Sequence, residues 1–388
     1  MRNQKRSDVL IVGAGPAGTR SARFLSADRE VTVVEEHKVS GRPVQCTGLI
    51  SDDVVRLSGV NVDVLNSLYG ANVHFPCGGV LTARSTERKA VLIDRSDLDV
   101  RMAGAAMDAG AEILYDTKYV KHTVAGGIVA AETSAGTFSS DILIGADGHS
   151  STVAASLGDN GPKEYVRGIQ VDIAHTMDDQ EILNIYVGSE TAPGFFAWVI
   201  PFGDKTRVGL CASSDMLPPA EYLKNLLRRT GLQNCRVLEK HSGKIPLGGR
   251  RITYGDNVLL IGDAAGQVKP ISGGGLYPAF RSVGPLYETV SDAFSKNDMS
   301  SSVLRSYEDR WKAEVGREMR NGYRLRKRYI RVNDKDFDKA FEKMNRPDVI
   351  SVLNGIDIDH PSDIARPLVK NVRVMMGLVP IALRTFFR

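Results

Sequence analysis

Short runs of apolar or β-branched residues recur along the chain and predict strands that are buried on both faces of a sheet. Residues 9–12 and 258–261 are fully apolar, and residues 31–34 are all β-branched. A helix is expected over residues 16–27, because Pro16 suits a first helical turn, where its missing N–H costs nothing. The chain therefore begins with a strand, a turn, a helix and a second strand, as in a parallel sheet.

Further along, the pattern alternates. Between residues 165 and 213, polar positions alternate with β-branched and aromatic ones, which predicts an antiparallel sheet. Residues 96–109 predict a helix with Ser96 as its N-cap, because acidic residues follow in the first turn. From about residue 302 onward the pattern is mainly helical and the charge becomes basic.

This order of elements predicts an α/β protein with a Rossmann-like nucleotide-binding domain of mixed sheet, an inserted antiparallel sheet for the substrate, and a basic helical C-terminal region. The nucleotide-binding domain is expected to be discontinuous in sequence. We expect it to comprise residues 1–75, 93–158 and 245–300, the inserted sheet to comprise residues 76–92 and 159–244, and the helical region to comprise residues 301–388.

Composition narrows the class of protein. Hydrophobic residues make up 42% and charged residues 25% of the 388, which is enough apolar surface for a folded core. A net charge of +4 does not indicate a nucleic-acid partner. The four cysteines form no Cys-x-x-Cys pair and have no histidine at metal-ligand spacing, so no metal site is expected. No apolar run has the length of a signal peptide or a spanning helix, and we expect a cytoplasmic protein.

A glycine-rich turn follows the first strand. In this pattern, the first glycine allows a tight turn, the second lets the backbone approach a pyrophosphate, and the third permits close packing of helix on strand. Glu35 ends the second strand 22 positions after Gly13, where a carboxylate accepts hydrogen bonds from a ribose. The predicted dinucleotide contacts are Gly13, Ala14, Gly15, Pro16, Ala17, Gly18 and Glu35.

Two further segments place an aspartate in a glycine-containing turn. Asp147 lies in the segment 144–150, and Asp263 follows the apolar run that ends at residue 261. A glycine-rich stretch continues from Asp263 to residues 273–275, and free N–H groups at a helix start there can meet phosphate or flavin oxygens. Either segment alone is also compatible with an ordinary turn.

Together the three motifs resemble the FAD-dependent family that includes the aromatic hydroxylases and the geranylgeranyl reductases, over residues 7–285. The resemblance implies FAD as the cofactor. It also implies that Asp147 supports the cofactor pocket, that Asp263 contacts the ribityl and phosphate groups, and that the loop at the flavin ring contributes Gly274, Gly275 and Leu276. Arg101, in a stretch like the helix entry of the family, is either a cofactor contact or a member of a surface ion pair.

Two stretches resemble the geranylgeranyl reductase branch of that family. Residues 42–51 are similar to a loop beside the flavin, which implies cofactor contacts from Cys46, Thr47, Gly48 and Leu49. Residues 193–201 are similar to an aromatic motif, but a phenylalanine stands where tyrosine is usual and an isoleucine where phenylalanine is usual. The first change removes a hydroxyl that could donate a proton.

The chemistry of these two stretches has more than one interpretation. Cys46 is a small apolar core residue, a flavin contact, or a catalytic proton donor or redox-tunable thiol. Phe196, Trp198 and Ile200 share one face of a strand, which either binds the substrate over the flavin or forms plain sheet core. The opposite face of that strand is expected to present Phe195.

The resemblance implies a reductase that saturates geranylgeranyl chains on glycerophospholipids, as in archaeal membrane lipids. The alternatives are an FAD-dependent monooxygenase of aromatic or apolar substrates and a non-enzymatic prenyl-lipid binder. A basic segment over residues 364–388, without acidic residues, indicates either peripheral binding to an anionic membrane or a docked helix, and residues 324–331 carry a second basic cluster. The electron donor is a ferredoxin-like carrier or a reduced nucleotide.

Overall fold

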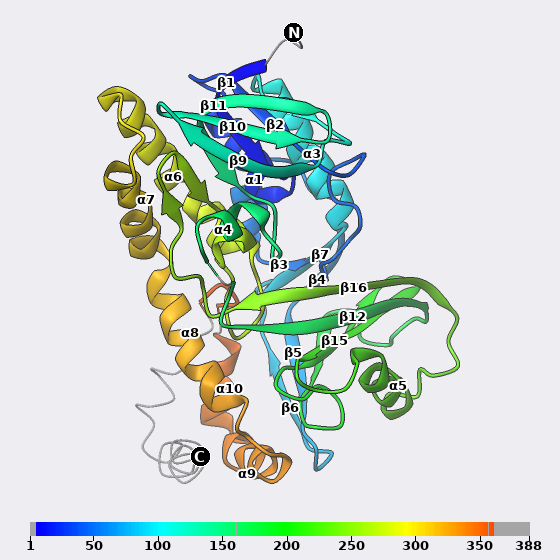
Figure 1. The fold of residues 1–388 in the computed structure, drawn as a ribbon. Helices are drawn as coiled ribbons and strands as arrows, with labels where there is room; N and C mark the ends of the chain where they lie inside the picture. Colours follow the sequence, from blue (N-terminus) through cyan, green and yellow to red (C-terminus); the bar gives the residue numbers. More distant parts are fainter. Residues whose placement is uncertain (1–4, 160, 356, 361–388) are drawn as a thin grey trace.

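The computed structural model describes residues 5–159, 161–355 and 357–360. They form three sheets with helices packed around them (Figure 1). An eight-stranded sheet lies at one end of the molecule and a seven-stranded sheet at the other. Helices α7 (Ser301–Glu314) and α8 (Gly316–Tyr329) run along one side of both. The α/β class and the two-sheet plan predicted from the sequence are confirmed.

The eight-stranded sheet belongs to the nucleotide-binding domain and has the order β17-β18-β11-β1-β2-β8, with β10 and β9 added beside β11. Its strands are β1 (Lys5–Val12), β2 (Val31–Val34), β8 (Glu112–Leu114), β9 (Tyr119–Ala125), β10 (Ile128–Thr133), β11 (Gly136–Gly145), β17 (Tyr254–Gly255) and β18 (Val258–Leu260). Strand β1 pairs in parallel with both β2 and β11.

Both faces of this sheet are covered, as the apolar runs predict. Val9 and Ile11 pack against α1 (Pro16–Leu25), α6 (Leu276–Lys296) and α7. Leu10 and Val12 point the other way, toward the β9–β10 hairpin and α4 (Thr152–Ser156). Because successive side chains of a strand alternate between faces, a fully apolar run needs cover on both.

The seven-stranded sheet has the order β16-β12-β15-β14-β13-β5-β6, and all its neighbours are antiparallel except β13 and β5. Its strands are β5 (Gly70–His74), β6 (Val80–Arg84), β12 (Glu164–Ala174), β13 (Ile182–Tyr186), β14 (Ala197–Phe202), β15 (Lys205–Ser213) and β16 (Val237–Leu247). Strand β5 joins this sheet, so the predicted domain boundary after residue 75 lies one strand too late. The parallel pairing of β5 with β13 is long-range, and local patterning does not reveal it.

The two faces of strand β14 meet different surroundings. Ala197 and Val199 pack against α5 (Pro219–Arg229). Trp198 and Ile200 point toward the nucleotide-binding domain and share an apolar cluster with Val268 of that domain. The small third sheet, with β3 (Leu49–Ile50), β4 (Val64–Leu68) and β7 (Ala90–Ile93), adds apolar side chains to the same cluster.

The described residues from 301 to 354 are mainly helical, as predicted, with α9 (Asp334–Met344) and α10 (Pro347–Asn354) after α8. Within the predicted basic cluster on α8, Arg326 is buried and bonds the Glu164 carboxylate at 2.7 Å, while Arg324 and Lys327 are exposed. The basic segment 364–388 lies outside the described residues. No helix in the described ranges is both long and apolar enough to cross a membrane.

Candidate functional site

In the glycine-rich turn between β1 and α1, Gly13 and Gly18 are packed against backbone atoms, whereas Gly15 borders open space. A Cβ on Gly13, at a φ of +102°, would lie 2.5 Å from the Ala146 carbonyl oxygen, and one on Gly18 would lie 2.0 Å from the Gly13 oxygen. A Cβ on Gly15 would meet no atom within 4 Å. The first turn of α1 has no side-chain cap, so its N–H groups are available to a phosphate at this open side.

Glu35 is fixed beside this turn. The backbone N–H of Ala14 donates to one carboxylate oxygen at 2.8 Å, and the N–H of His37 donates to the other at 2.9 Å. The Glu35 side chain is buried, directly after β2. A carboxylate held in this position has the placement that a ribose acceptor requires.

Asp147 is a structural support for the same region. Its carboxylate accepts hydrogen bonds from the Ser151 hydroxyl at 2.5 Å and from the backbone N–H groups of Thr152 and Val153 at 2.7 and 3.1 Å. These contacts hold the first turn of α4. Burial raises the pKa of Asp147, against the lowering effect of these hydrogen bonds.

Asp263 enters a short 3₁₀ helix, Gly262–Ala265, at the end of β18. Burial raises the pKa of its carboxyl to about 6, although the nearby Arg95 guanidinium works in the opposite direction. Among the described residues, no group donates a hydrogen bond to this carboxylate. A half-buried carboxylate without donors fits ribityl hydroxyls, which would supply the missing hydrogen bonds.

The loop after Asp263 brings Gly274 and Gly275 to the start of α6. A Cβ on Gly275 would lie 2.8 Å from an Asp263 carboxylate oxygen, and one on Gly274 would lie 2.8 Å from the side chain of Lys269. Leu276 is the first residue of α6, which has no side-chain cap. These contacts leave no room for a side chain at either glycine, and residues 273–276 are partly exposed, so their backbone is accessible to a planar ring system.

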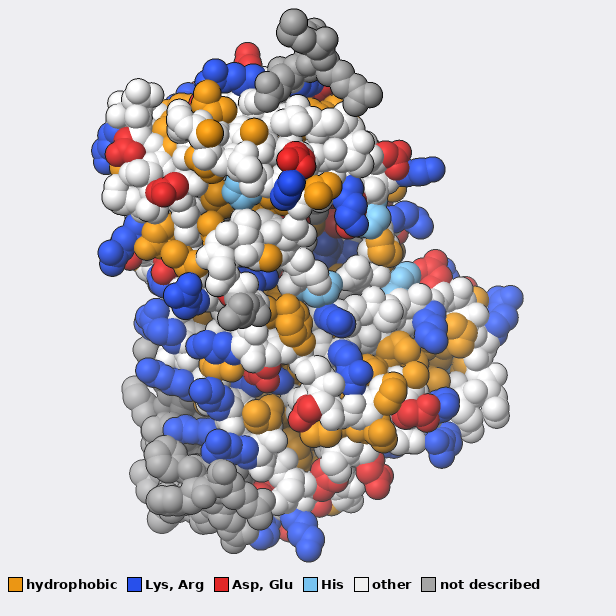
Figure 2. Space-filling model, in the orientation of Figure 1, with side chains coloured by type: hydrophobic (Ala, Val, Ile, Leu, Met, Phe, Trp, Pro, Cys, Tyr) orange, Lys and Arg blue, Asp and Glu red, His pale blue; other side chains and the backbone are white. Residues whose placement is uncertain are grey.

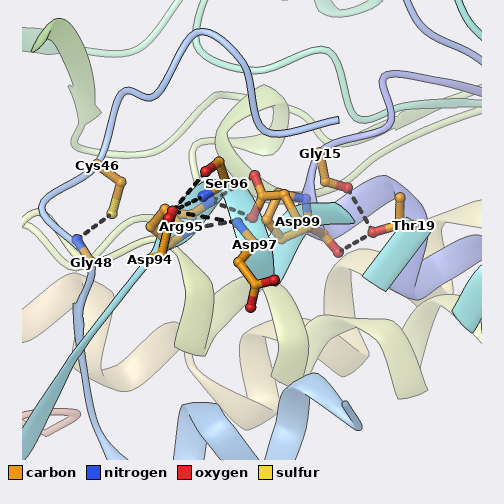
Figure 3. Close-up of polar contacts among 10 residues, drawn as sticks. Gly15, Thr19, Cys46, Gly48, Asp94, Arg95, Ser96, Asp97 and Asp99 are labelled. Atoms are coloured by element: carbon orange, nitrogen blue, oxygen red, sulfur yellow. Dashed lines mark hydrogen bonds and ion pairs between the residues drawn. The ribbon is translucent and has the colours of Figure 1, made fainter. Parts of the chain in front are cut away.

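Arg95, which the sequence analysis did not single out, occupies the centre of the site. Its guanidinium bonds the buried Asp99 carboxylate at 3.0–3.2 Å and interacts electrostatically with the side chain of Cys46. Figure 3 shows Arg95 and Asp99 between the loop of Cys46 and Gly48 and the turn that contains Gly15. The four-residue spacing of Arg95 and Asp99 was the available signal, since such pairs meet on one helix face.

The predicted Arg101 lies elsewhere on the same helix, α3 (Arg95–Asp108). It is exposed on one side and pairs with Asp97 at 2.7 Å and Asp63 at 2.8 Å, which is the ion-pair alternative. The predicted N-cap is also corrected. Because α3 begins at Arg95, Ser96 lies inside the helix, and Asp94 is the N-cap that accepts a hydrogen bond from the Ser96 N–H at 2.8 Å.

The loop that carries Cys46 is anchored by the seven-stranded sheet. Gln170 on β12 donates its side-chain amide to the Cys46 carbonyl at 3.1 Å, and Arg207 on β15 donates to the Thr47 carbonyl. Gly48 has a φ of +80°, and a Cβ there would lie 2.3 Å from a backbone oxygen of β7. Leu49 then begins β3. The Cys46 thiol is thereby held between the two large sheets.

The opposing wall of the site is aromatic. Trp198 and Ile200 are buried in the cluster that faces the nucleotide-binding domain, and Phe196 packs against it. Phe195 also joins this cluster, stacked on Phe196 at 4.6 Å, so the prediction that it faces the other side is wrong. Both phenylalanines precede β14, and strand alternation does not apply to them.

Three buried polar atoms around this wall have no hydrogen-bond partner in the described structure. They are the indole nitrogen of Trp198, the side-chain oxygen of Gln170 and the hydroxyl of Ser272. Such atoms are rare in folded proteins unless a ligand or water satisfies them. With the open turn at Gly15 and the donor-free Asp263, they indicate that the residues fit FAD. The described residues contain no cluster of metal ligands.

Comparisons with known proteins agree with this geometry. Residues 6–320 match the family model described as an FAD binding domain, which makes FAD the cofactor. The solved structure of a geranylgeranyl bacteriochlorophyll reductase-like protein from Thermoplasma acidophilum has a TM-score of 0.85 and 21% identity, with 98% of this chain and 100% of that chain covered. At this identity the likeness shows the fold.

Two relatives align over nearly the whole chain. An uncharacterized protein of Methanocaldococcus jannaschii is 30% identical over 385 residues, with 97% of this chain and 98% of that protein covered. The digeranylgeranylglycerophospholipid reductase of Methanothrix thermoacetophila is 30% identical over 365 residues, with 89% and 93% covered. The chain therefore belongs to the FAD binding domain family, in the group of relatives that includes the digeranylgeranylglycerophospholipid reductases.

Proposed function

We propose that this protein is an FAD-dependent reductase that saturates the double bonds of geranylgeranyl chains on glycerophospholipids. The observation that carries the proposal is the buried aromatic and aliphatic wall of Phe195, Trp198 and Ile200. This wall belongs to the seven-stranded sheet and faces residues 42–51, which we call the flavin loop. A hydrocarbon chain needs an apolar surface, and the half-buried Phe196, packed against this wall, leaves one there. The reductase relatives support this substrate class.

Saturation of an isolated double bond adds a hydride to one carbon and a proton to the other. Reduced FAD supplies the hydride when it is bound at the site. The residues of the chain exclude water, since the wall around Trp198 is buried, and they orient the alkene against the flavin loop. We propose that the Cys46 thiol delivers the proton, because it is held at the junction of the two sheets and Phe196 has no hydroxyl to donate.

The positions of the predicted cofactor residues support their proposed roles. The segment 13–18 and Glu35 surround the place for the pyrophosphate and ribose, and Asp263 with residues 274–276 forms the side toward the flavin. Cys46, Thr47, Gly48 and Leu49 close the site from the opposite direction. We add Arg95 to this set and leave out Arg101, which is engaged in surface ion pairs.

We also propose that the protein binds an anionic membrane surface peripherally to reach its lipid substrate. The outer face of α8 presents exposed cations at helical spacing, including Arg320, Arg324, Lys327 and Arg328. Figure 2 shows a column of Lys and Arg side chains along this edge of the molecule. Each cation near an anionic bilayer contributes about 1 kcal/mol to the free energy of binding.

The proposed electron donor is a ferredoxin-like carrier or a reduced nucleotide.

The test of the reductase activity is anaerobic. The flavin is reduced chemically, a geranylgeranyl ether phospholipid is added, and flavin reoxidation is followed together with the lipid mass. Reoxidation with a gain of two hydrogen atoms per double bond is expected. A flavin that stays reduced until oxygen enters, with a hydroxylated product, would instead assign a monooxygenase.

Two variants on adjacent positions of β14 localise the substrate. Trp198→Leu changes the wall that faces the flavin loop, and Val199→Ala changes the face packed on α5. We expect both proteins to bind FAD and only Trp198→Leu to lose lipid turnover. Equal loss in the two variants would show a general effect on the strand and would remove the argument for the wall.

A further inference from the structure

Arg20 is a buried cation that forms no ion pair within the described part of the chain. It lies on α1, one turn after the glycine-rich turn, and its side chain is 9% exposed. The guanidinium sits over the rings of Phe24 and Phe280, at 5.0 and 5.2 Å from their centres. Its Nε atom has no hydrogen-bond partner, and no carboxylate among the described residues pairs with it. A buried charge in this condition is costly unless a ligand compensates it.

A second guanidinium meets the first. The Nη1 atom of Arg23 donates to the Gly59 carbonyl at 2.7 Å. A Cβ built on Gly59 would lie 2.7 Å from Nη1 of Arg23 and 3.6 Å from Nη1 of Arg20, so both cationic groups converge on one point. Burial and the neighbouring Arg23 lower the pKa of Arg20 to about 10. Two cations are therefore held together at a place where their mutual repulsion is unrelieved.

Both arginines line a shallow, open hollow of the surface, of about 470 Å³. The remaining lining residues are Phe24, Ala27, Gly59 and Tyr287, none of which is acidic. The nearest acids on α2 (Asp52–Ser58) are already engaged, because Asp53 pairs with Arg56 and Asp52 pairs with Arg88. Outside the described residues, Asp363 is the only acidic side chain of the sequence.

We propose that this hollow is a binding site for a phosphate monoester, held by Arg20 and Arg23. Guanidinium groups bond phosphate oxygens in pairs, which suits two arginines that converge on one point. The exposed ring of Phe24 and the ring of Tyr287 give the ligand an apolar wall beside its phosphate. The phosphate belongs to a phospholipid headgroup or to a nucleotide. The site lies on the outer side of α1 and does not depend on the proposed reductase activity.

The test uses the full-length protein in low-salt, phosphate-free buffer. The protein is saturated with FAD, so that added phosphate does not compete with the cofactor for its site. The melting temperature is measured during titration with inorganic phosphate and, separately, with sodium chloride at equal ionic strength. The variants are Arg20→Met, which keeps the apolar contacts, and Arg305→Met, a control at an exposed position on α7. Arg23→Met replaces the first variant if that protein does not fold.

We expect phosphate to raise the melting temperature of wild type and Arg305→Met more than chloride does, and Arg20→Met to weaken phosphate binding by about tenfold or more. Equal shifts with phosphate and chloride, or an undiminished phosphate shift in Arg20→Met, would overturn the proposal. Parallel titrations identify the source. Tighter binding of glycerol phosphate than of adenosine 2′-phosphate assigns a lipid headgroup, and the reverse order assigns a nucleotide.

Discussion

Replacing Arg207 with methionine should leave a buried carboxylate without its cation. In the structure, the Arg207 guanidinium makes two 2.7 Å hydrogen bonds to Asp172 on the neighbouring strand β12. The two side chains are 11% and 8% exposed. Removal of one member of a buried ion pair costs about 3–5 kcal/mol, since the other member loses its compensation. At a urea slope of about 3 kcal/mol per M, the unfolding midpoint should fall by about 1 M or more.

The double variant Arg207→Met/Asp172→Leu separates stability from function. It removes both charges, and replacement of a buried ion pair by apolar residues is often close to neutral, so the midpoint should return toward that of wild type. The hydrogen bond from Arg207 to the Thr47 carbonyl remains lost. We therefore expect lipid reduction to be slower than in wild type in both the single and the double variant, because the loop that holds Cys46 has lost an anchor.

Urea unfolding with FAD bound, followed by circular dichroism, measures the first effect, and anaerobic flavin reoxidation measures the second. Arg228→Met, at an exposed position on α5, is the control and should change neither. A decrease in the free energy of unfolding of less than about 1 kcal/mol in Arg207→Met is the range of exposed ion pairs and would refute the cost assigned to burial. Full turnover in the double variant would refute the role of the Thr47 contact.

Three other predictions follow from the site. Gly15→Ala should fold normally but bind FAD about tenfold more weakly in a fluorescence titration, whereas Gly18→Ala should lose stability, because its Cβ would lie 2.0 Å from a backbone oxygen. The folded-state pKa of Asp263 is about 6 against an ordinary 3.8, so the cofactor-free folded protein binds this proton more tightly than the unfolded chain. Its stability to urea should fall as pH rises from about 4 to about 6, and Asp263→Asn should remove that fall. Alkylation of Cys46 in a Cys77→Ser/Cys235→Ser background should slow lipid reduction, and an unchanged turnover and FAD spectrum after complete alkylation would contradict any functional role for the thiol.

Much of the nucleotide-binding domain was predictable, because its signals are local. The apolar run at residues 9–12 and the glycine pattern at residues 13–18 each act through neighbours in the sequence, and the structure has the expected strand, turn and helix there. Glu35 follows from the same local unit. Its carboxylate accepts a hydrogen bond from the Ala14 N–H, and the spacing between the glycine-rich turn and the end of the second strand, which the sequence displays, predicts that proximity.

Other features depend on contacts between distant segments. The buried amine of Lys269 bonds the Asp359 carboxylate at 2.8 Å, across 90 residues, and no periodicity in either segment indicates the pairing. Phe195 was assigned to the wrong side because alternation holds only inside a strand, and β14 begins two residues later. Arg20 appears in sequence as one more polar position on a helix. Only the approach of Phe280 on α6 and of Gly59, which follows α2, to α1 shows that it is buried.

The anchoring of residues 42–48 has a consequence for engineering and for divergence in this family. In sequence this loop belongs to the cofactor domain, yet Gln170 and Arg207 of the other sheet hold its backbone. The seven-stranded sheet is therefore not an exchangeable cassette. A chimera that imports strands β12 to β15 from a relative would also have to import that relative's loop, and a lineage that changes its substrate preference would have to alter the two segments in concert.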